Sequence, residues 1–226
     1  KIVSKTSFNE VWIQPAAGDA GGALGAALET YVLKSKKKPN EMKTASLGLK
    51  YKENEIKEAL KSFDLNGHKI TFFKDSNLCD DKVAQLLTQA KVIGYFQGRF
   101  EWGPRALGNR SIIVDPRIQN MKKLLNDKIK KRESFRPFAP SILEHCVEDW
   151  FEEKAKVPFM THVFKIKKEK RNIIPAVVHV DGTGRLQTVN IENNKRYFSL
   201  IEKFSKLTQI PMILNTSFNE NEPIVN

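Results

Sequence analysis

Short apolar runs alternate with amphipathic segments along this chain, and that alternation limits the fold more than any other feature of the sequence. Short apolar runs are typical of buried strands, whereas apolar residues spaced three and four apart are typical of helices. Strands are expected at Val11–Ile13, Ile70–Phe73, Val92–Phe96, Ser111–Val114, Phe159–Ile166, Gln187–Val189 and Pro211–Leu214. Helices are expected at Ala23–Leu33, Glu53–Phe63, Asp80–Ala90, Ile118–Ile129 and Lys195–Leu207. Intermixed helices and strands predict an α/β or α+β fold with a mixed sheet.

The formal net charge of +12 makes anions the expected partners of this chain. Two basic runs, Lys34–Lys38 and Lys165–Arg171, are typical of a solvated surface. Nucleic acid is the alternative partner, although both runs are short and contain no aromatic residues. No apolar run approaches the roughly 18 residues that span a bilayer, and Cys79 and Cys146 have no CxxC partner. We therefore expect a cytoplasmic protein without a membrane segment, a disulfide framework or a cysteine zinc site.

A polar segment from Lys34 to Asn40 contains a proline and is typical of a linker. It separates a short first unit, which ends near Lys43, from a second unit that begins near Thr44. The sequence opens and closes abruptly, and its last residues, Glu222–Asn226, have the character of a loop interior. We therefore expect this chain to be a piece of a longer protein.

The loop Gly98–Arg110 concentrates cations between two expected strands. Three glycines and a proline shape its backbone, and it contains Arg99, Arg105 and Arg110. Arginine offers a planar, bidentate match to phosphate or carboxylate, so the loop is interpreted as an anion-binding site. The alternative is that Glu101 pairs with one of these arginines and only holds the loop closed.

A second cationic stretch, Lys130–Pro140, begins where an expected helix ends. The helix dipole favours cations at that end, which is sufficient to explain Lys130–Arg132. It does not explain Arg136, which is flanked by Phe135 on one side and by a proline and Phe138 on the other. A guanidinium among apolar groups needs a partner, and the anion of a ligand would serve.

Three further segments have two interpretations each. Gly18–Gly22 is either a phosphate-binding turn, with Asp19 as a metal ligand, or a tight turn that allows close helix packing. His179 precedes an Asp-Gly-Thr-Gly turn that leads to Arg185, and the histidine is interpreted as structural. Leu214–Asn219 ends an expected strand with short amide and hydroxyl side chains, which suit either phosphate and ribose or the capping of a turn.

The sequence contains no nucleophile–base constellation, because a Cys–His motif, a G-x-S-x-G elbow and an HExxH motif are all absent. What recurs is positive charge on constrained loops. Such charge acts by positioning a substrate and by neutralising charge that develops on phosphoryl and acyl oxygens. This pattern favours transfer chemistry on a phosphorylated or nucleotide substrate over hydrolysis by a covalent triad.

Taken together, these segments resemble the carbamoyltransferases of the nodulation-protein U and cephem-carbamoylation family. The resemblance follows the chain in order from near its start to near its end. It rests on Trp12–Ala27, Gln97–Arg117, Lys131–Pro140, His179–Val189 and Leu214–Asn219. The long blocks from Gln97 to Arg117 and from Arg132 to Pro140 are the most specific parts of this match.

The resemblance implies two domains. Residues 1–43 would be the tail of an actin- or sugar-kinase-like transfer domain that holds a metal ion, expected to be iron. Asp19 falls on its one remaining metal-ligand position, and Gly21 and Gly22 are expected to bind cofactor beside it. Residues 44–226 would be a YrdC-like domain, a twisted mixed sheet with flanking helices, truncated at its C-terminus.

The resemblance also implies the activity of the second domain, which would form carbamoyl-adenylate from carbamoyl phosphate and ATP with Mg²⁺. The carbamoyl group would then pass to a hydroxyl-bearing small molecule. The family's contacts fall on Arg105, Lys130, Arg136, Arg185, Asn215 and Ser217. The first and third of these would bind the carbamoyl and phosphate oxygens, and Lys130 and Arg185 the nucleotide phosphates. Asn215 and Ser217 would bind phosphate or ribose.

Two other functions remain open from the sequence. One is a threonylcarbamoyl-adenylate synthase of tRNA modification, which shares the YrdC fold. The segment Gly18–Ala27 argues against it, because that segment implies a fused transfer domain. The other is a non-catalytic RNA-binding module that uses the basic surface, with an affinity that falls steeply with salt.

Overall fold

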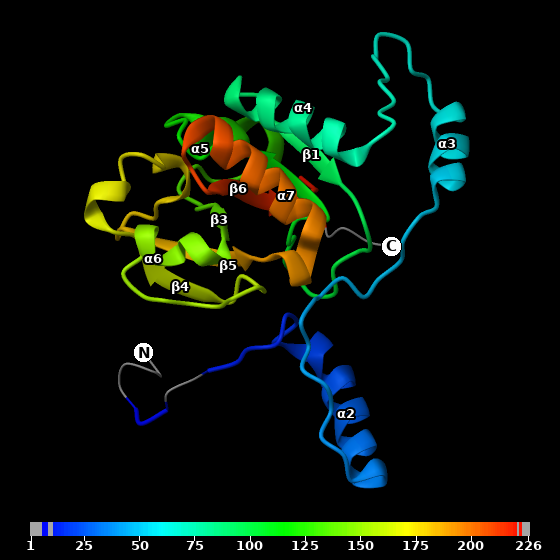
Figure 1. Cartoon of the computed structure of the whole chain (residues 1–226), viewed down its shortest axis with the longest axis vertical. Helices are drawn as coiled ribbons and strands as arrows, with labels where there is room; N and C mark the ends of the chain where they lie inside the picture. Colours follow the sequence, from blue (N-terminus) through cyan, green and yellow to red (C-terminus); the bar gives the residue numbers. More distant parts are fainter. Residues whose placement is uncertain (1–5, 9–10, 221, 223–226) are drawn as a thin grey trace.

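The computed structural model describes residues 6–8, 11–220 and 222, and its centre is a six-stranded sheet (Figure 1). The strand order is β1-β2-β6-β3-β5-β4. The strands are β1 Ile93–Phe96, β2 Arg110–Val114, β3 Ala139–Leu143, β4 His162–Lys165, β5 Thr183–Val189 and β6 Met212–Ser217. Only β3 and β5 pair in parallel, and each of the other neighbours pairs antiparallel. The expected α/β class with a mixed sheet is therefore confirmed.

Two long helices, α4 and α7, pack against each other on one face of the sheet (Figure 1). The other helical segments are shorter or lie outside the sheet. In chain order, all the helical segments are η1 Asp19–Gly21, α2 Gly22–Ser35, α3 Glu53–Lys61, α4 Ser76–Thr88, α5 Met121–Leu124, the π-helix η2 Leu125–Lys130, η3 Glu144–Cys146, α6 Val147–Trp150, η4 Lys168–Lys170, η5 Pro175–Val177 and α7 Ile191–Thr208.

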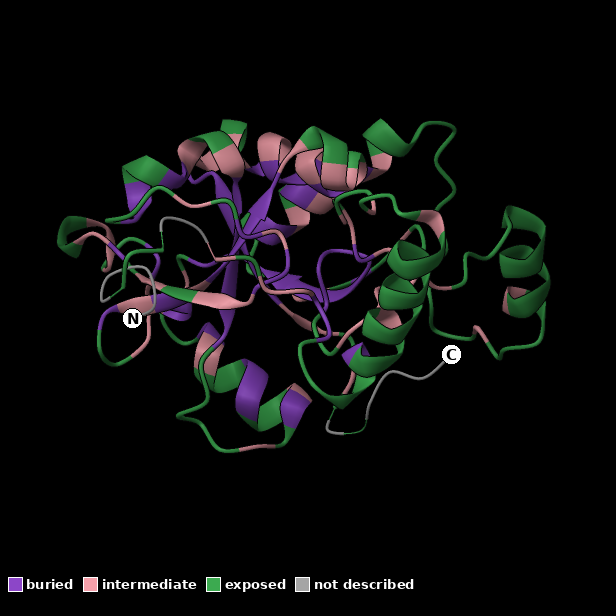
Figure 2. Cartoon of the chain, turned by 90° about the horizontal axis from the view of Figure 1, so that it is seen from below, coloured by how far each residue is buried: buried purple, intermediate pink, exposed green. Residues whose placement is uncertain are grey.

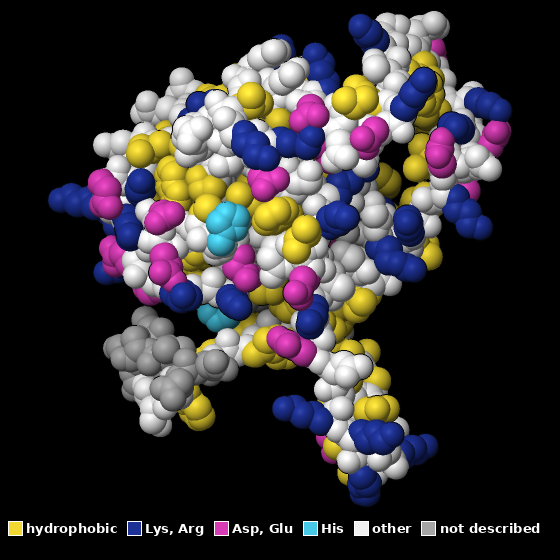
Figure 3. Space-filling model, viewed as in Figure 1, with side chains coloured by type: hydrophobic (Ala, Val, Ile, Leu, Met, Phe, Trp, Pro, Cys, Tyr) yellow, Lys and Arg dark blue, Asp and Glu magenta, His cyan; other side chains and the backbone are white. Residues whose placement is uncertain are grey.

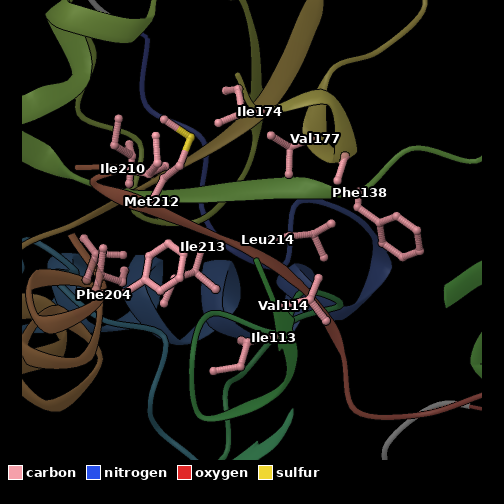
Figure 4. Close-up of a cluster of buried hydrophobic side chains, with 14 of the residues drawn as sticks. Ile113, Val114, Phe138, Ile174, Val177, Phe204, Ile210, Met212, Ile213 and Leu214 are labelled. Carbon is pink, nitrogen blue, oxygen red and sulfur yellow. The ribbon is translucent and has the colours of Figure 1, made fainter. Parts of the chain in front are cut away.

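The hydrophobic core lies on both faces of the central strand β6, because successive side chains of a strand point to opposite faces. Figure 4 shows Ile213 beside Phe204 of α7 on one face, with Ile174 and Val177 on the other. These residues are fully or almost fully buried. Burial of about 1.5–3 kcal/mol per large apolar side chain makes this double-sided core the main stabilising contribution. The core holds rigid the strand ends from which the site is built.

Two helices project from this body and are exposed along their length (Figures 1 and 2). Neither α2 nor α3 contains a buried residue. The apolar face expected for Glu53–Phe63 is present but unburied, since Ile56 is 44% and Phe63 69% exposed. Among the helices that the structure describes, none has the length and apolar character that crossing a bilayer requires.

Two expected strands are wrong. Val11–Ile13 and Ile70–Phe73 are extended but pair with no strand. Both lie away from the sheet, where no strand edge is available, and Phe72 is 72% exposed. An apolar run of three or four residues forms a strand only where a neighbouring strand accepts its hydrogen bonds.

One central strand, β3, was not expected from the sequence. It contains Pro140, a residue that argues against an interior strand position because it donates no ladder hydrogen bond. The strand forms nevertheless between β6 and β5, with Pro140 opposite Leu214. In the opposite sense, the expected buried strand Val92–Phe96 is β1 at the edge of the sheet, where Phe96 is 47% exposed.

Candidate functional site

A pocket of about 220 Å³ lies where two loops meet the ends of β5 and β6. The loop between β1 and β2 contributes Arg105, and the loop after the π-helix contributes Arg136. Strand β5 contributes Arg185, and the end of β6 contributes Asn215 and Ser217. The structure thus brings five of the six residues expected to contact the substrate into one pocket. Pro104, Ala106, Arg132, Pro137, Phe138, Met160 and Thr216 complete its lining.

The Arg-rich loop is held closed by Glu101. Its Oε1 accepts backbone hydrogen bonds from Leu107 at 2.8 Å and from Asn109 at 2.8 Å. The alternative interpretation of the sequence required Glu101 to pair with an arginine side chain. Glu101 binds backbone amides instead. Glu101 nevertheless holds the loop closed, because one of its carboxylate oxygens accepts hydrogen bonds from the backbone on both sides of Gly108.

Two of the three arginines in this loop support it from within. Arg110 lies between two aromatic rings, 3.6 Å from the centroid of Phe96 and 3.9 Å from that of Phe100. Its guanidinium also donates to the Gln97 carbonyl at 2.6 Å. Arg99 donates to a backbone carbonyl at 3.1 Å. Of the three, only Arg105 lines the pocket, and it makes no hydrogen bond or ion pair within the described part of the chain.

A buried polar network supports the Arg105 loop from below. Asn215 Nδ2 donates to the Ala106 carbonyl at 3.0 Å and to Gln187 Oε1 at 3.0 Å. Gln187 Nε2 donates in turn to the Leu107 carbonyl at 2.9 Å. The amide nitrogen of Asn215 is committed to these acceptors, whereas its Oδ1 is buried and has no partner among the described residues. The pocket therefore contains a buried hydrogen-bond acceptor as well as its cations.

Arg185 is the most strongly perturbed cation of the pocket. Burial, together with the nearby charges of Arg105 and Arg132, lowers the pKa of Arg185 to about 10. Its Nε is buried and has no hydrogen-bond partner among the described residues. Among the described residues, no carboxylate lines the pocket to offset these charges. An unpaired buried charge is costly and is retained at sites that bind a counter-ion.

Lys130, the sixth expected contact, lies behind the pocket and does not line it. Its Nζ donates to the carbonyls of Ser217 and Asn219, each at 2.6 Å, and to Ser217 Oγ at 3.1 Å. Burial and the neighbouring Arg132 lower the pKa of Lys130 to about 8. The ammonium therefore fastens the π-helix to the end of β6, and all of its acceptors here are protein atoms. Its expected contact with nucleotide phosphates stays a prediction.

The turn at the start of α2 is tight, as its sequence allowed, but the close helix packing expected beside it is not seen, because α2 contains no buried residue. A Cβ at Gly21 would meet Gln14 Nε2 at 1.8 Å and the Ala16 carbonyl at 2.4 Å, so no side chain fits there. Gly22 has open space around its Cα, and Asp19 is exposed. Within residues 6–8, 11–220 and 222, no group of three or more His, Cys, Asp or Glu gathers to hold a metal ion. Asp19 alone cannot hold a metal ion, and its expected role as one ligand of an iron site stays a prediction.

His179 belongs to the turn before β5 and not to an acid–base pair. Its Nδ1 lies 3.0 Å from Thr183 Oγ1, and that hydroxyl donates to Asp181 Oδ1 at 2.7 Å. The hydroxyl proton is committed to Asp181, so Nδ1 of the histidine is the donor in this contact. The His179 Nε2 is buried without a partner among the described residues. The structural interpretation of this residue agrees with these contacts.

A pH dependence of stability follows from His179. Burial, with smaller effects from Arg185 and Lys122, lowers the pKa of its imidazole. The unfolded chain therefore binds a proton at a higher pH, and stability present above about pH 6.5 is lost as the pH falls toward the folded pKa. We expect His179→Gln to lose less stability than the wild type between about pH 7 and pH 5. Urea unfolding at both pH values measures this, and equal losses would contradict it.

The structure defines an α/β protein with a small pocket whose lining includes four arginines. Residues 84–226 match the family model of the carbamoyltransferase C-terminus, and residues 1–28 match that of the carbamoyltransferase N-terminus. The chain belongs to the carbamoyltransferase family. The expected family is thereby confirmed.

Individual relatives agree with this assignment. Nodulation protein NolNO of Sinorhizobium fredii is 41% identical and NolO of Bradyrhizobium diazoefficiens 42% identical, each over the whole of this chain. Nodulation protein U of Rhizobium tropici is 35% identical over 94% of it. The chain spans 33%, 41% and 34% of the lengths of these three relatives, respectively.

One pocket residue, Arg132, was missed by the sequence analysis. Its place directly after a cationic helix end was attributed to the helix dipole. The sequence signal that could have identified Arg132 is its spacing of four residues from Arg136. The structure adds that the π-helix ends before Lys131, whose backbone is left-handed. The reversal at Lys131 turns both arginines toward the same pocket.

Proposed function

We propose that this pocket binds carbamoyl phosphate and that, with ATP, it forms carbamoyl-adenylate for transfer to a hydroxyl acceptor. The observation that carries this proposal is the combination of unpaired guanidinium groups and an unpaired buried acceptor at one site. Arg105 and Arg185 have no ion-pair partner in the described part of the chain, and Asn215 Oδ1 accepts no hydrogen bond there. Carbamoyl phosphate carries a dianionic phosphate for the first and an NH₂ group for the second.

The size of the pocket supports a small ligand. Its volume of about 220 Å³ is below the roughly 300–1,000 Å³ typical of ligand sites. Carbamoyl phosphate and the reacting phosphoryl group of a nucleotide are together of this scale and leave little room for a nucleoside beside them. The base and ribose of ATP would therefore lie outside it, beyond the end of β6.

The proposed reaction needs charge stabilisation and not a protein nucleophile. Water attacks the phosphorus of carbamoyl phosphate, which releases inorganic phosphate and carbamate. A carbamate oxygen then attacks the α-phosphorus of ATP, the bond to the β-phosphate breaks, and pyrophosphate leaves. In both steps negative charge moves onto phosphoryl oxygens, and fixed guanidinium groups stabilise it without reorganising. Asn215 would orient the carbamoyl nitrogen through its free oxygen.

Mg²⁺ accompanies ATP in this proposal, but the pocket does not fit it as a protein-bound ion. Mg²⁺ prefers oxygen ligands, usually carboxylates together with substrate phosphates. The pocket lining contains guanidinium, amide and hydroxyl groups but no carboxylate. Any ion at this site would be held by the phosphates of the nucleotide, and the chain's own residues act through charge and hydrogen bonds.

The test is exchange of labelled pyrophosphate into ATP, which reports reversible adenylate formation. We expect exchange by the protein that depends on carbamoyl phosphate and falls by at least about 100-fold in Arg105→Ala, because a charge-assisted contact to the reacting group is lost. Arg99→Ala is the matched control, since this arginine of the same loop only supports a backbone carbonyl. Exchange without carbamoyl phosphate, or exchange retained in Arg105→Ala, would refute the proposal.

A further inference from the structure

Arg132 lines the same pocket as Arg105, Arg136 and Arg185, and no role is assigned to it by the expected contacts. Its Nε donates to Asn126 Oδ1 at 2.8 Å. The centre of its guanidinium lies 5.0 Å from the centroid of the Phe138 ring. Its two terminal nitrogens have no protein acceptor in the described part of the chain. One edge of the guanidinium is therefore fixed by the protein, and the other is left for a ligand.

Asn126 is the residue that fixes this arrangement. It is fully buried in the π-helix, a type of segment that is common at functional sites. Its Nδ2 donates to the carbonyls of Ser134 at 3.2 Å and Arg136 at 3.0 Å, and its own carbonyl accepts from the Arg132 amide at 3.1 Å. One side chain thus shapes the loop that carries both arginines. The loop is preorganised by the protein and does not need an anion to form.

The cations of the pocket form a connected series. The charges of Arg105 and Arg132 both act on Arg185, and that of Arg136 acts on Arg132. Glu133 pairs with Arg136 at 2.8 Å, but both side chains are about half exposed, so this pair is weak. A single phosphate dianion balances two of the four guanidinium groups. The pocket therefore has the charge for a second phosphoryl group.

We propose that Arg132, next to Arg136, binds a second phosphoryl group in this pocket and that Asn126 positions the Arg132 side chain. This inference rests on the proposed function, in which pyrophosphate is the leaving group. Arg132 and Arg136 then serve the phosphates of the nucleotide that leave, whereas Arg105 and Arg185 serve the phosphate of the carbamoyl donor. The fork of Arg132 offers two parallel donors to phosphoryl oxygens, which a lysine cannot reproduce.

The test compares the binding of inorganic phosphate and of pyrophosphate to the protein by calorimetry at constant ionic strength. We expect Arg132→Gln to weaken pyrophosphate binding by about tenfold or more, as the loss of a charge-assisted contact predicts. Phosphate binding should stay within about twofold of the wild type. Arg132→Lys keeps the charge and loses only the fork, so its affinity for pyrophosphate should lie between those of the wild type and Arg132→Gln. Lys131→Gln removes an adjacent exposed cation and should change neither.

The outcomes separate this inference from the proposed function. If Arg132→Gln weakens neither ligand, or weakens both equally, Arg132 does not serve a second phosphoryl group. If Arg105→Ala abolishes phosphate binding while Arg132→Gln leaves pyrophosphate binding unchanged, the proposed function survives and only this inference fails. If the wild-type protein binds neither phosphate nor pyrophosphate, both are refuted. Circular dichroism of each variant establishes that the fold is retained.

Discussion

Arg185→Met is expected to make the protein more stable and, at the same time, unable to bind carbamoyl phosphate. The Arg185 side chain is partly buried, with its Nε enclosed, and has no counter-ion among the described residues; its burial and the charges of Arg105 and Arg132 lower its pKa to about 10. A folded-state pKa below the ordinary value means that folding disfavours the charged form. Replacing the charge by an apolar side chain of similar length removes this cost, and the free energy of unfolding should rise by about 1–3 kcal/mol.

The same substitution removes a central cation of the pocket, so affinity for carbamoyl phosphate should fall by about 100-fold or more. Urea unfolding and calorimetric titration measure the two effects separately. Arg117→Met is the opposite control: Arg117 pairs with the buried Asp115 at 2.6 Å, outside the pocket. Its loss leaves a buried carboxylate unpaired and should cost about 3 kcal/mol without changing affinity. An Arg185→Met protein that is less stable than the wild type would show that Arg185 is paired in solution.

The pocket was largely predictable from the sequence, because its cations lie in loops whose composition has no simple structural explanation. Charge among glycine, proline and aromatic residues identified Arg136 and the loop that contains Arg105, the family resemblance singled out Arg105 within that loop, and both arginines line the pocket. Charge alone did not distinguish Arg105 from Arg110, which occupies the same loop. Only the structure shows that Arg110 is enclosed by Phe96 and Phe100, since the second ring reaches it through the path of the loop.

The fold was predictable where the apolar pattern is long and periodic, and the prediction failed where tertiary contacts decide. The helix expected at Lys195–Leu207 is the main part of α7; a turn from Ile191, capped by Asn190 accepting from the amide of Asn193 at 2.9 Å, precedes it, and the non-helical Asn194 separates the two. Strand β3 depends on β5 and β6 on either side, and no local pattern marks it. The arrangement of basic residues on the surface is likewise decided by the tertiary structure. On the face in Figure 3, Lys and Arg are dispersed among Asp and Glu and form no continuous stripe.

Lys130→Met is expected to lower the free energy of unfolding by about 2–4 kcal/mol and to weaken anion binding indirectly. The ammonium donates to oxygens of Ser217, which ends the strand that carries Asn215, and of Asn219, two residues beyond it. A methionine fills the space but leaves these acceptors without their donor, which costs the desolvation of each one. Because the π-helix and β6 are then no longer joined, the loop with Arg136 and the end of β6 lose their fixed separation.

Lys131→Met separates this effect from the general loss of a positive charge. Lys131 is the next residue, but its side chain is 61% exposed and pairs with Glu220 at the surface. Its substitution should change the free energy of unfolding by less than about 0.5 kcal/mol. Urea unfolding of both variants compares their stability, and calorimetric titration with phosphate measures whether each variant still binds an anion. Should Lys130→Met be as stable as the wild type while binding is lost, the ammonium contacts the ligand directly, as the family resemblance implies. If Lys130→Met loses stability and Lys131→Met does not, the role of Lys130 is to hold the π-helix and the end of β6 together.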